Sequence, residues 1–285
     1  MKHADRPLVA WIEGIGLRGP GLDGWAASAD VLARRVPYAA GTTILVAPTQ
    51  LPPAERRRVG KGVKIALEAG FAAIAGSGRD GATLPSIFTS SSGDGDNCDA
   101  ICRALADDRL ISPTRFHNSV HNAPSGYWGI ASGSMAPSTS LCAYDDSFAA
   151  GLDDAMTQIA GGSDAVLLVA YDAPYPEPLH AARPTPDSFA VGLVLTREAG
   201  PHALARIEMR NDASDAAASS LPDAALERIR SDIPAARALP LLAAIARHAD
   251  VDVVLCAATG ARTRIAVHPL PILATAPAER LTTCT

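Results

Sequence analysis

The stretch over residues 137–172 constrains the fold of this chain more than any other part of the sequence. It contains a loop that leads into a short buried strand over residues 138–142, a helical pattern over residues 148–159 and a continuous apolar run over residues 165–170. Before the helical pattern, Asp145, Asp146 and Ser147 offer the side chains that cap helix N-termini. The order predicted is therefore strand, turn, helix, strand.

The predicted helix has one apolar face, because apolar residues recur there at spacings of three and four. These residues are Phe148, Leu152, Met156 and Ile159. The neighbouring small residues 149–151 would let another backbone come close. The run 165–170 has no polar alternation and is short, which favours a strand buried on both faces. We therefore expect an α/β fold whose central sheet is covered by helices.

Composition supports a globular protein that acts outside the membrane. The chain has 285 residues, of which 48% are hydrophobic and 19% charged, and no run approaches the length of a membrane span. The first ten residues lack the apolar core of a signal peptide, so we expect a cytoplasmic protein. A net charge of −5 argues against nucleic-acid binding. The five cysteines, at 98, 102, 142, 256 and 284, form no CxxC pair, which favours reduced thiols.

Several short motifs suggest cofactors or metals but lack the context that such sites need. Gly14, Gly16 and Gly19 form GxGxxG after an apolar run, yet the following Pro20 prevents the helix that a dinucleotide fold requires. The acidic loop 94–99 departs from the calcium-binding pattern and is expected to cap a helix over residues 100–106. We predict no cofactor and no metal.

The cysteines and histidines of the first half also lack the neighbouring ligands of a metal site. Cys98 and Cys102, one turn apart, have no nearby histidine and are expected to pack against the core. His117 and His121 are four residues apart, so a helix would place both imidazoles on one face. They lack an acidic third ligand, which leaves a structural or interface role as the favoured interpretation.

The sequence resembles the β-ketoacyl synthases, the condensing enzymes of the thiolase fold. The resemblance is carried by a Ser-Pro-x-x-Phe-x-x-Ser-x-x-Asn segment and by the stretch 126–172 that follows it. The segment consists of Ser112, Pro113, Phe116, Ser119 and Asn122. Further matches are Leu51-Pro52, the helical pattern 63–75 and the opening strand 8–16 with Gly21 and Trp25. Together they cover about residues 8 to 195.

The resemblance implies a thiolase-like architecture. We expect one central mixed sheet with helices on both faces and the helix after Ser147 buried in the middle. The chain is too short for two full thiolase halves, so we expect one domain over residues 1–285, with a core over 8–200 and a reduced C-terminal portion over 201–285. In that portion the patterns predict a loop over 212–220, helices over 223–231 and 240–248, and strands over 251–257 and 263–267.

The chain departs from the family at the nucleophile. In the condensing enzymes a cysteine lies eight residues after the proline, which from Pro137 gives Asp145, whereas counting back from Asp164 gives Tyr144. Neither residue is a good acyl nucleophile that can also leave. Cys142 comes two or three residues too early and is expected to be a small buried hydrophobe. An alternative remains open, in which Cys142 is an acyl-transfer nucleophile with His117 or His121 as its base.

The second half also lacks the two histidine contexts that condensing enzymes use. None of them occurs around His202, His248 or His268. The chain therefore resembles the chain-length-factor subunits of type II polyketide and aryl-polyene systems, which lost the nucleophile. The resemblance implies a non-catalytic subunit of fatty-acid or polyketide biosynthesis that forms a heterodimer with a full-length β-ketoacyl synthase. A homodimer stays possible on the sequence alone.

The resemblance also assigns surfaces to this role. It places residues of the segment 116–122 at the acyl tunnel and the subunit interface, namely Phe116, His117, Ser119, His121 and Asn122. It gives Tyr144 a packing role, filling the volume that a synthase leaves open for its thioester. Arg56, Arg57, Arg58 and Lys61 form the strongest positive cluster of an acidic protein, which would suit docking of an acidic acyl carrier protein. The competing interpretation of that cluster is a solvated helix face.

Overall fold

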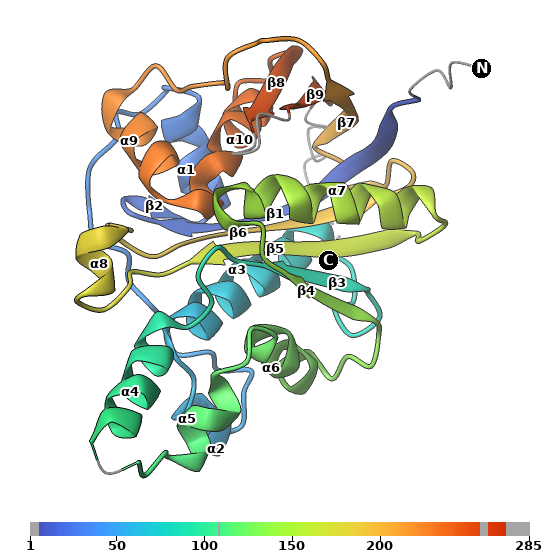
Figure 1. Ribbon diagram of the computed structural model, residues 1–285. Coiled ribbons are helices and arrows are strands. Elements are labelled where there is room, and N and C mark those ends of the chain that lie inside the picture. The colour runs from blue at the N-terminus through green and yellow to red at the C-terminus, as the bar shows by residue number, and fades with distance from the viewer. Residues whose placement is uncertain (1–5, 108, 257–261, 272–285) are drawn as a thin grey trace, which may run out of the picture.

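A computed structural model describes residues 6–107, 109–256 and 262–271 (Figure 1). Its strands join in one nine-stranded mixed sheet in which β4, β3 and β5 are parallel and all other neighbours are antiparallel. The order is β4-β3-β5-β6-β1-β7-β9-β8, and β2 pairs with β1. The strands are β1 (Leu8–Gly19), β2 (Leu22–Asp23), β3 (Ser86–Thr89), β4 (Ser138–Leu141), β5 (Ala165–Asp172), β6 (Phe189–Thr196), β7 (Ala205–Asp212), β8 (Val251–Cys256) and β9 (Arg262–Pro269).

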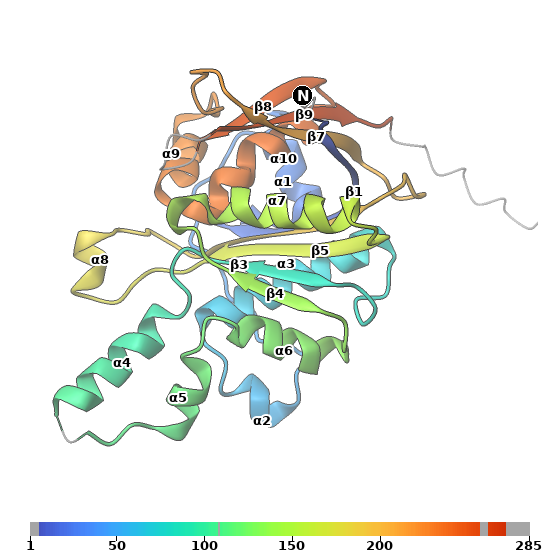
Figure 2. The same cartoon turned by 45° about the vertical axis from the view of Figure 1, so that its right-hand side comes forward.

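Helices cover both faces of this sheet, as expected. The helices are α1 (Trp25–Leu32), α2 (Pro53–Arg56), α3 (Lys61–Ser77), α4 (Gly95–Ala106), α5 (Pro113–Asn118), α6 (Ala123–Ser132), α7 (Ser147–Ala160), α8 (Leu179–Ala182), α9 (Ala224–Asp232) and α10 (Leu239–Ala246), with the 3₁₀ turns η1 (Tyr144–Asp146) and η2 (Pro234–Ala238). α3 and α6 pack on one face, and α7, α1 and α10 on the other (Figures 1 and 2). β7, β9 and β8 curve over this second group of helices, so that α7 lies between two layers of strands (Figure 2).

The strand β5 shows how the two faces of the sheet are filled. Its residues alternate between two apolar clusters, with Leu168 packed in the α7 cluster and Val169 in the α3 cluster. All eight residues of β5 are buried. The predicted helix and strand of this region are therefore confirmed, and α7 is the buried central helix.

The glycines of the GxGxxG motif serve helix packing. β1 runs without a break through the motif to Gly19, and α3 crosses it closely. A Cβ atom at Gly14 or Gly16 would lie about 2 Å from the carbonyl oxygen of Ala73 or Ala69 in α3. Only glycine permits this approach of backbone to backbone.

The reduced second half follows the predicted pattern closely. Residues 213–220 form a loop, Asp223 caps α9, and α10, β8 and β9 lie within about two residues of the expected bounds. Residue 257, the predicted end of the first strand, lies outside the described residues. The strand β7 and the turn η2 were not predicted. Among residues 6–107, 109–256 and 262–271, no helix is both long and apolar enough to span a membrane.

The helical pattern 63–75 lies within α3, whereas the helix expected over residues 100–106 was wrong in its first residue. The positive pattern after residue 54 forms the short helix α2 and then α3, because the backbone is extended at Gly60 between them. The helix expected over residues 100–106 begins earlier, at Gly95, because Asp94 is its N-cap and accepts a hydrogen bond from the Asn97 backbone N–H at 3.0 Å.

Candidate functional site

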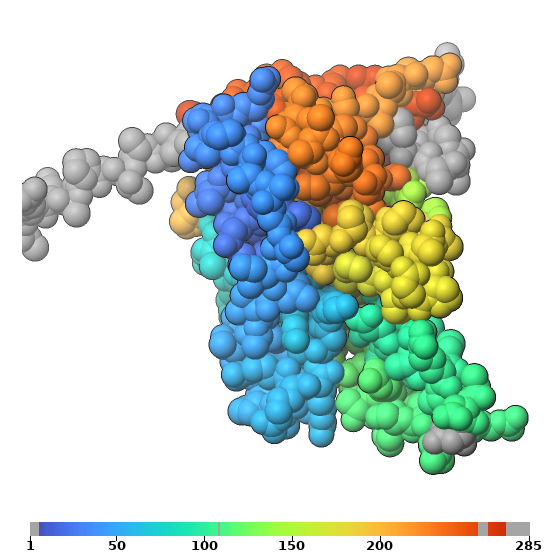
Figure 3. Space-filling view, turned by 90° about the vertical axis from the view of Figure 1, so that its left-hand side faces the viewer, coloured from blue at the N-terminus to red at the C-terminus, as the bar shows by residue number. Residues whose placement is uncertain are grey.

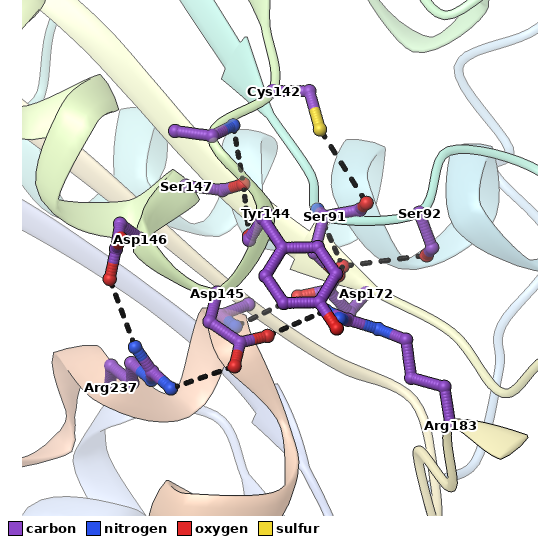
Figure 4. Close-up of polar contacts among 12 residues, drawn as sticks. Ser91, Ser92, Cys142, Tyr144, Asp145, Asp146, Ser147, Asp172, Arg183 and Arg237 are labelled. Atoms are coloured by element: carbon purple, nitrogen blue, oxygen red, sulfur yellow. Dashed lines mark hydrogen bonds and ion pairs between the residues drawn. The ribbon is translucent and has the colours of Figure 1, made fainter. Parts of the chain in front are cut away.

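The candidate site is the turn between β4 and α7, which we call the elbow (residues 142–147, Figure 4). Tyr144 has φ 54°, in the left-handed region that non-glycine residues rarely adopt. Ser147 holds this conformation. Its hydroxyl donates to the Tyr144 carbonyl at 2.7 Å and accepts from the Ala143 backbone N–H at 3.1 Å. A strained residue at the start of the central helix is a position of the kind that functional sites use.

The carboxylate of Asp145 is shared by two arginines. Arg183 Nη2 lies 2.6 Å from Asp145 Oδ1, and Arg237 Nη2 lies 3.1 Å from Oδ2. Arg237 also reaches Asp146, at 3.1 Å. The Asp145 side chain is only partly exposed. Solvent and salt therefore screen these charge-assisted contacts less than they screen fully exposed ion pairs. Asp145 is therefore held as an ion-pair partner with both oxygens engaged, which leaves it poorly placed to act as a nucleophile.

Tyr144 lies at the surface. Within the described chain it does not fill an interior volume, contrary to the expectation. Its side chain is 57% exposed, and the Arg183 guanidinium stacks 3.6 Å from the centre of its ring. Arg183 comes from residues 173–188, which we call the strap. The strap lies between the second half and the lobe formed by α4 and α5 (Figure 3). Arg103 on α4 also donates to its Glu177 carbonyl at 3.1 Å.

The prediction that Cys142 is buried was wrong. The residue is exposed, because β4 is the last strand of the sheet and ends one residue before it. Its Sγ contacts the Ser91 carbonyl oxygen at 3.5 Å. His121 makes no hydrogen bond to this thiol within the described residues; its Nε2 lies 3.0 Å from the carbonyl oxygen of Leu141 instead. Among the described contacts, Cys142 has no imidazole base.

His117 and His121 do not share a helix face, contrary to the prediction. α5 ends at Asn118, before His121, so the two imidazoles belong to different segments. His117 is exposed and His121 half-buried. Phe116 is 67% exposed on α5, where its carbonyl accepts from the Ser119 hydroxyl at 2.8 Å. The segment is thus a surface feature whose outermost apolar side chain is Phe116.

A fully buried carboxylate, that of Asp172, lies beside the elbow and was not predicted from the sequence. Asp172 Oδ1 accepts hydrogen bonds from the Ser91 backbone N–H at 2.9 Å and hydroxyl at 2.7 Å, and from the Ser90 hydroxyl at 3.1 Å. Burial raises the pKa of Asp172, and these hydrogen bonds oppose that shift. The Ser90–Ser92 run and an acid at a strand end were the available signals in the sequence.

A cavity of about 240 Å³ adjoins the elbow. It lies between the start of α7 and strand β8, and its lining includes Asp145, Phe148, Ser219, Arg230, Arg237 and Leu255. Neither a cysteine nor a histidine is among the described residues that line it. The groups beside the elbow can therefore bind ions and hydrogen-bonding groups, but they offer no thiolate and no imidazole for acyl transfer.

Most of the predicted docking cluster is already engaged within the chain. Arg56 donates to the Thr49 and Leu51 carbonyls at 3.2 and 3.0 Å, and Lys61 pairs with Asp96 at 2.8 Å. Arg58 pairs with Glu55 at 3.2 Å. Within the part of the chain that the structure describes, Arg57 is exposed and its side chain makes no ion pair or hydrogen bond.

Metal ligands do not gather in the described ranges. Across residues 6–107, 109–256 and 262–271, no three His, Cys, Asp or Glu side chains converge on one point. The prediction that Cys98 and Cys102 pack in the core was wrong, since both are exposed on the outer side of α4. Burial nevertheless raises the pKa of the Cys98 thiol, and the neighbouring Cys102 adds to that effect.

Comparison with known proteins places the chain in a family. A family profile described as β-ketoacyl synthase, N-terminal domain, matches residues 25–249. A solved complex of a ketosynthase with its chain length factor from Xenorhabdus doucetiae contains a similar chain, with 25% identity, a TM-score of 0.69, and coverage of 91% of this chain and 99% of that chain. The two chains are therefore close in length. No curated protein matches the sequence.

Two further solved structures share the fold. The ishigamide ketosynthase/chain length factor is 16% identical with a TM-score of 0.69, over 92% of this chain and 100% of that chain. A type II polyketide synthase acyl-carrier protein in complex with its ketosynthase contains a chain that is 12% identical with a TM-score of 0.70, over 93% and 100% of the two chains. The resemblance found in the sequence, and the thiolase-like fold that it implied, are confirmed.

Proposed function

Because the chain belongs to the family of β-ketoacyl synthase N-terminal domains, we propose that it is a non-catalytic subunit that pairs with an active ketosynthase as its chain length factor. The pair would extend acyl chains in fatty-acid, polyketide or aryl-polyene biosynthesis. We treat residues 1–285 as one domain in this role, since a single sheet joins strands of the core 8–200 with strands of the portion 201–285.

The observation that carries the proposal is the chemistry of the elbow. The two positions that match the family's nucleophile hold Tyr144, which is strained and exposed, and Asp145, whose two oxygens bind Arg183 and Arg237. A thioester intermediate needs a thiolate that attacks and later leaves. We therefore assign Tyr144 and Asp145 to structure and recognition.

The histidines of the second half support the same conclusion. His202 and His248 lie beside α1 and the turn after β6, where they line a different cleft from the one at the elbow. His268 lies on β9 and pairs with Asp250 at 3.0 Å. None of the three reaches the elbow, so decarboxylation of an extender unit would have to occur on the partner.

The free edge of the sheet is the surface proposed for the partner. β4 pairs with β3 alone and leaves its outer backbone groups unpaired by any described strand. Exposed β edges invite pairing with another chain. The opposite edge, β8, is occupied at Val254, because the Ser219 N–H donates to the Val254 carbonyl and the Ser219 hydroxyl accepts from the Val254 N–H, both at 2.9 Å.

Large apolar side chains flank this free edge. Met135, in the turn before β4, is 96% exposed, and Ile130 on α6 is half-exposed. Phe116 and Val120 lie on the segment that the resemblance places at the interface. Buried anchors of this kind dominate binding energy in stable interfaces. We propose that the synthase covers them and that Phe116, with His117, Ser119, His121 and Asn122 around it, borders the acyl tunnel.

A carrier protein is the second proposed partner. Arg57 is available for an acidic surface, and Lys61 remains half-exposed beside Asp96. Arg56 and Arg58 serve the α2 turn itself and would contribute through long-range charge. Such a cluster would speed and orient docking more than it would raise affinity.

The experiment that tests the function is reconstitution. The chain is purified alone, and together with an active ketosynthase whose own cysteine and histidines are intact, and each sample receives acyl and malonyl carrier thioesters. We expect carbon–carbon bond formation by the pair and product lengths that depend on this chain. A synthase that forms the same products at the same rate without this chain would overturn the proposal.

The alternative, acyl transfer by Cys142, is tested in the same preparation. The exposure of Cys142 beside the elbow is the observation in its favour. A thiol-directed acyl electrophile should label Cys142 no faster than Cys98 or Cys102 if it is an ordinary surface thiol. Selective labelling of Cys142 that His121→Ala abolishes would support the alternative.

A further inference from the structure

A second cleft lies at the opposite end of the sheet from the elbow. The elbow follows β4 beside Ala170, near the end of β5, whereas the turn after β6 leaves the sheet beside Ala165, at the start of β5. The cleft adjoins this turn. It has a volume of about 460 Å³, which is in the range of small-molecule sites.

The floor and walls of the cleft are apolar. Ile245 and Ala246, at the end of α10, are buried and form the floor, and Leu204 packs against the same core. Trp25 and Ala29 of α1 form one wall, and both pack against the core while remaining partly exposed to the cleft. α1 and α10 lie side by side between the two strand layers (Figure 2). Such a surface suits an aliphatic or aromatic body.

The polar groups of the rim are all potential cations or donors. His202, His248 and Arg35 line the cleft, and its described lining contains no Asp or Glu. Arg35 is partly neutralised by Asp30, at 2.7 Å, and donates to the Ala246 carbonyl at 3.2 Å. In the described ranges the imidazoles of His202 and His248 make no hydrogen bond or ion pair, so their donors are available.

The backbone holds the rim residues in fixed places. His248 follows α10, has φ 50° and donates its backbone N–H to the Ile245 carbonyl at 3.1 Å. Leu204 donates to the Ile12 carbonyl and accepts from the Leu270 N–H, both at 2.8 Å. The walls that carry the histidines are thus tied to β1 and to the chain after β9.

From this combination we propose that the cleft binds a small amphipathic carboxylic acid, with its apolar body against Trp25 and Ile245 and its carboxylate at His202 and His248. An apolar pocket with a few convergent donors is the usual form of such sites. In a protein of net charge −5, a rim without carboxylates also selects for an anion. The site does not involve the elbow, and its occupancy requires no partner.

The test uses the full chain labelled with 5-fluorotryptophan and sodium octanoate as the probe. Fluorine NMR reports separately on the three tryptophans, of which Trp25 lines the cleft, Trp128 is buried and Trp11 lies beside Arg206. We expect a saturable shift of the Trp25 signal alone, assigned with Trp25→Phe. An unmoved Trp25 signal, or equal shifts of all three, would overturn the proposal.

Two comparisons test how the acid is recognised. Octanol has the same apolar body without charge and should bind more weakly. His202→Ala combined with His248→Ala removes both donors and should weaken octanoate at least tenfold, the size expected for hydrogen bonds to a charged group, and leave octanol nearly unchanged. If both ligands weakened equally, the histidines would only shape the cleft, and the proposed recognition of a carboxylate would be wrong.

A pair of variants on α1 tests the location. Ala29→Phe would fill the cleft and should abolish the shift with either probe. Ala27→Phe, on the exposed side of the same helix, should leave octanoate binding intact. Binding that survived Ala29→Phe would place octanoate elsewhere and would contradict the assignment.

Discussion

The Asp172 carboxylate accepts a hydrogen bond from the Ala235 backbone N–H at 2.8 Å, across 63 positions of the sequence. Its other oxygen binds the Ser91 loop, whose carbonyl in turn contacts Cys142. One buried side chain therefore joins the end of β5, the loop after β3 and the turn η2 that begins the last helical part of the chain. It fixes the reduced second half against the first.

Removal of this carboxylate should destabilise the whole chain. In Asp172→Ala the Ser91 and Ala235 N–H groups lose their acceptor inside the protein, and each buried unsatisfied donor costs about 1–3 kcal/mol. We expect the free energy of unfolding to fall by about 3 kcal/mol, measured by chemical denaturation. Asp232→Ala, at an exposed site, is the control and should change it by less than about 0.5 kcal/mol.

The pH dependence of stability gives a separate prediction for Asp172. Because burial raises its pKa in the folded state, the folded chain binds the proton more tightly than the unfolded chain. Its contribution to stability is therefore largest below the ordinary aspartate pKa of about 3.9 and is lost as pH rises through the folded pKa. The difference in unfolding free energy between wild type and Asp172→Asn should fall from acid toward neutral pH. A difference that rose with pH would contradict the raised pKa.

The ion pairs of Asp145 should matter more than those at the surface. Asp145→Ala leaves Arg183 and Arg237 without their shared partner, and their side chains are only 18% and 25% exposed. We expect a loss of about 1–2 kcal/mol and faster proteolysis of the strap. Asp164→Ala breaks the exposed pair with Arg197 and is the matched control, with an expected loss below about 0.5 kcal/mol. Equal losses in the two variants would contradict a role for Asp145 in holding the strap.

The sequence predicted the central unit well because its signals are local. α7 shows apolar periodicity along its length and is followed by Gly161, and β5 is a continuous apolar run. The predicted N-cap of α7 is not formed, since Asp146 makes no side-chain cap hydrogen bond and pairs with Arg237 instead. The close contact of Gly14 and Gly16 with α3 could not be predicted from the motif, since it depends on which helix crosses β1. The motif itself lies within β1, which continues to Gly19.

The site was predicted less well because its contacts are distant in sequence. Arg183 and Arg237 reach Asp145 from 38 and 92 positions away, and no local sequence pattern predicts these ion pairs. Cys142 was expected in the core because it ends a run predicted to be a short buried strand, but β4 is an edge strand and leaves it exposed. Edge and centre are properties of strand order, which the sequence of one chain does not reveal.

Charge reversal tests the proposed carrier docking surface. Arg57→Glu combined with Lys61→Glu should lower the rate of product formation by the heterodimer at low salt, and the deficit should shrink as salt screens the charges. Arg228→Glu, also exposed but on α9, should leave the rate unchanged. An unaltered rate for the double variant at low salt would contradict carrier docking and support the alternative interpretation, in which the cluster is a solvated helix face.

Phe116 offers a test of the tunnel assignment. If its exposed ring borders the acyl tunnel in the heterodimer, Phe116→Ala removes volume from the tunnel wall and should shift the products of the pair toward longer chains. Ile44→Ala is the control, because Ile44 is exposed to a similar degree in the segment between α1 and α2. Analysis of the products formed with a carrier protein distinguishes the two variants. Unchanged product length for Phe116→Ala would contradict the assignment of this residue to the tunnel wall.

The last prediction concerns catalysis by the chain alone. The purified chain should form no carbon–carbon bond from acyl and malonyl carrier thioesters, because the elbow holds Tyr144 and Asp145 in place of a thiolate. Tyr144→Cys should not restore the reaction. It supplies a thiol, but His121 remains bound to the Leu141 carbonyl and the second-half histidines lie elsewhere, so no described imidazole can assist decarboxylation. The Tyr144→Cys thiol should still react with an acyl electrophile, which would show that it is accessible. Condensation by this variant without a partner would contradict both the non-catalytic assignment and the view that the second half has lost its catalytic groups.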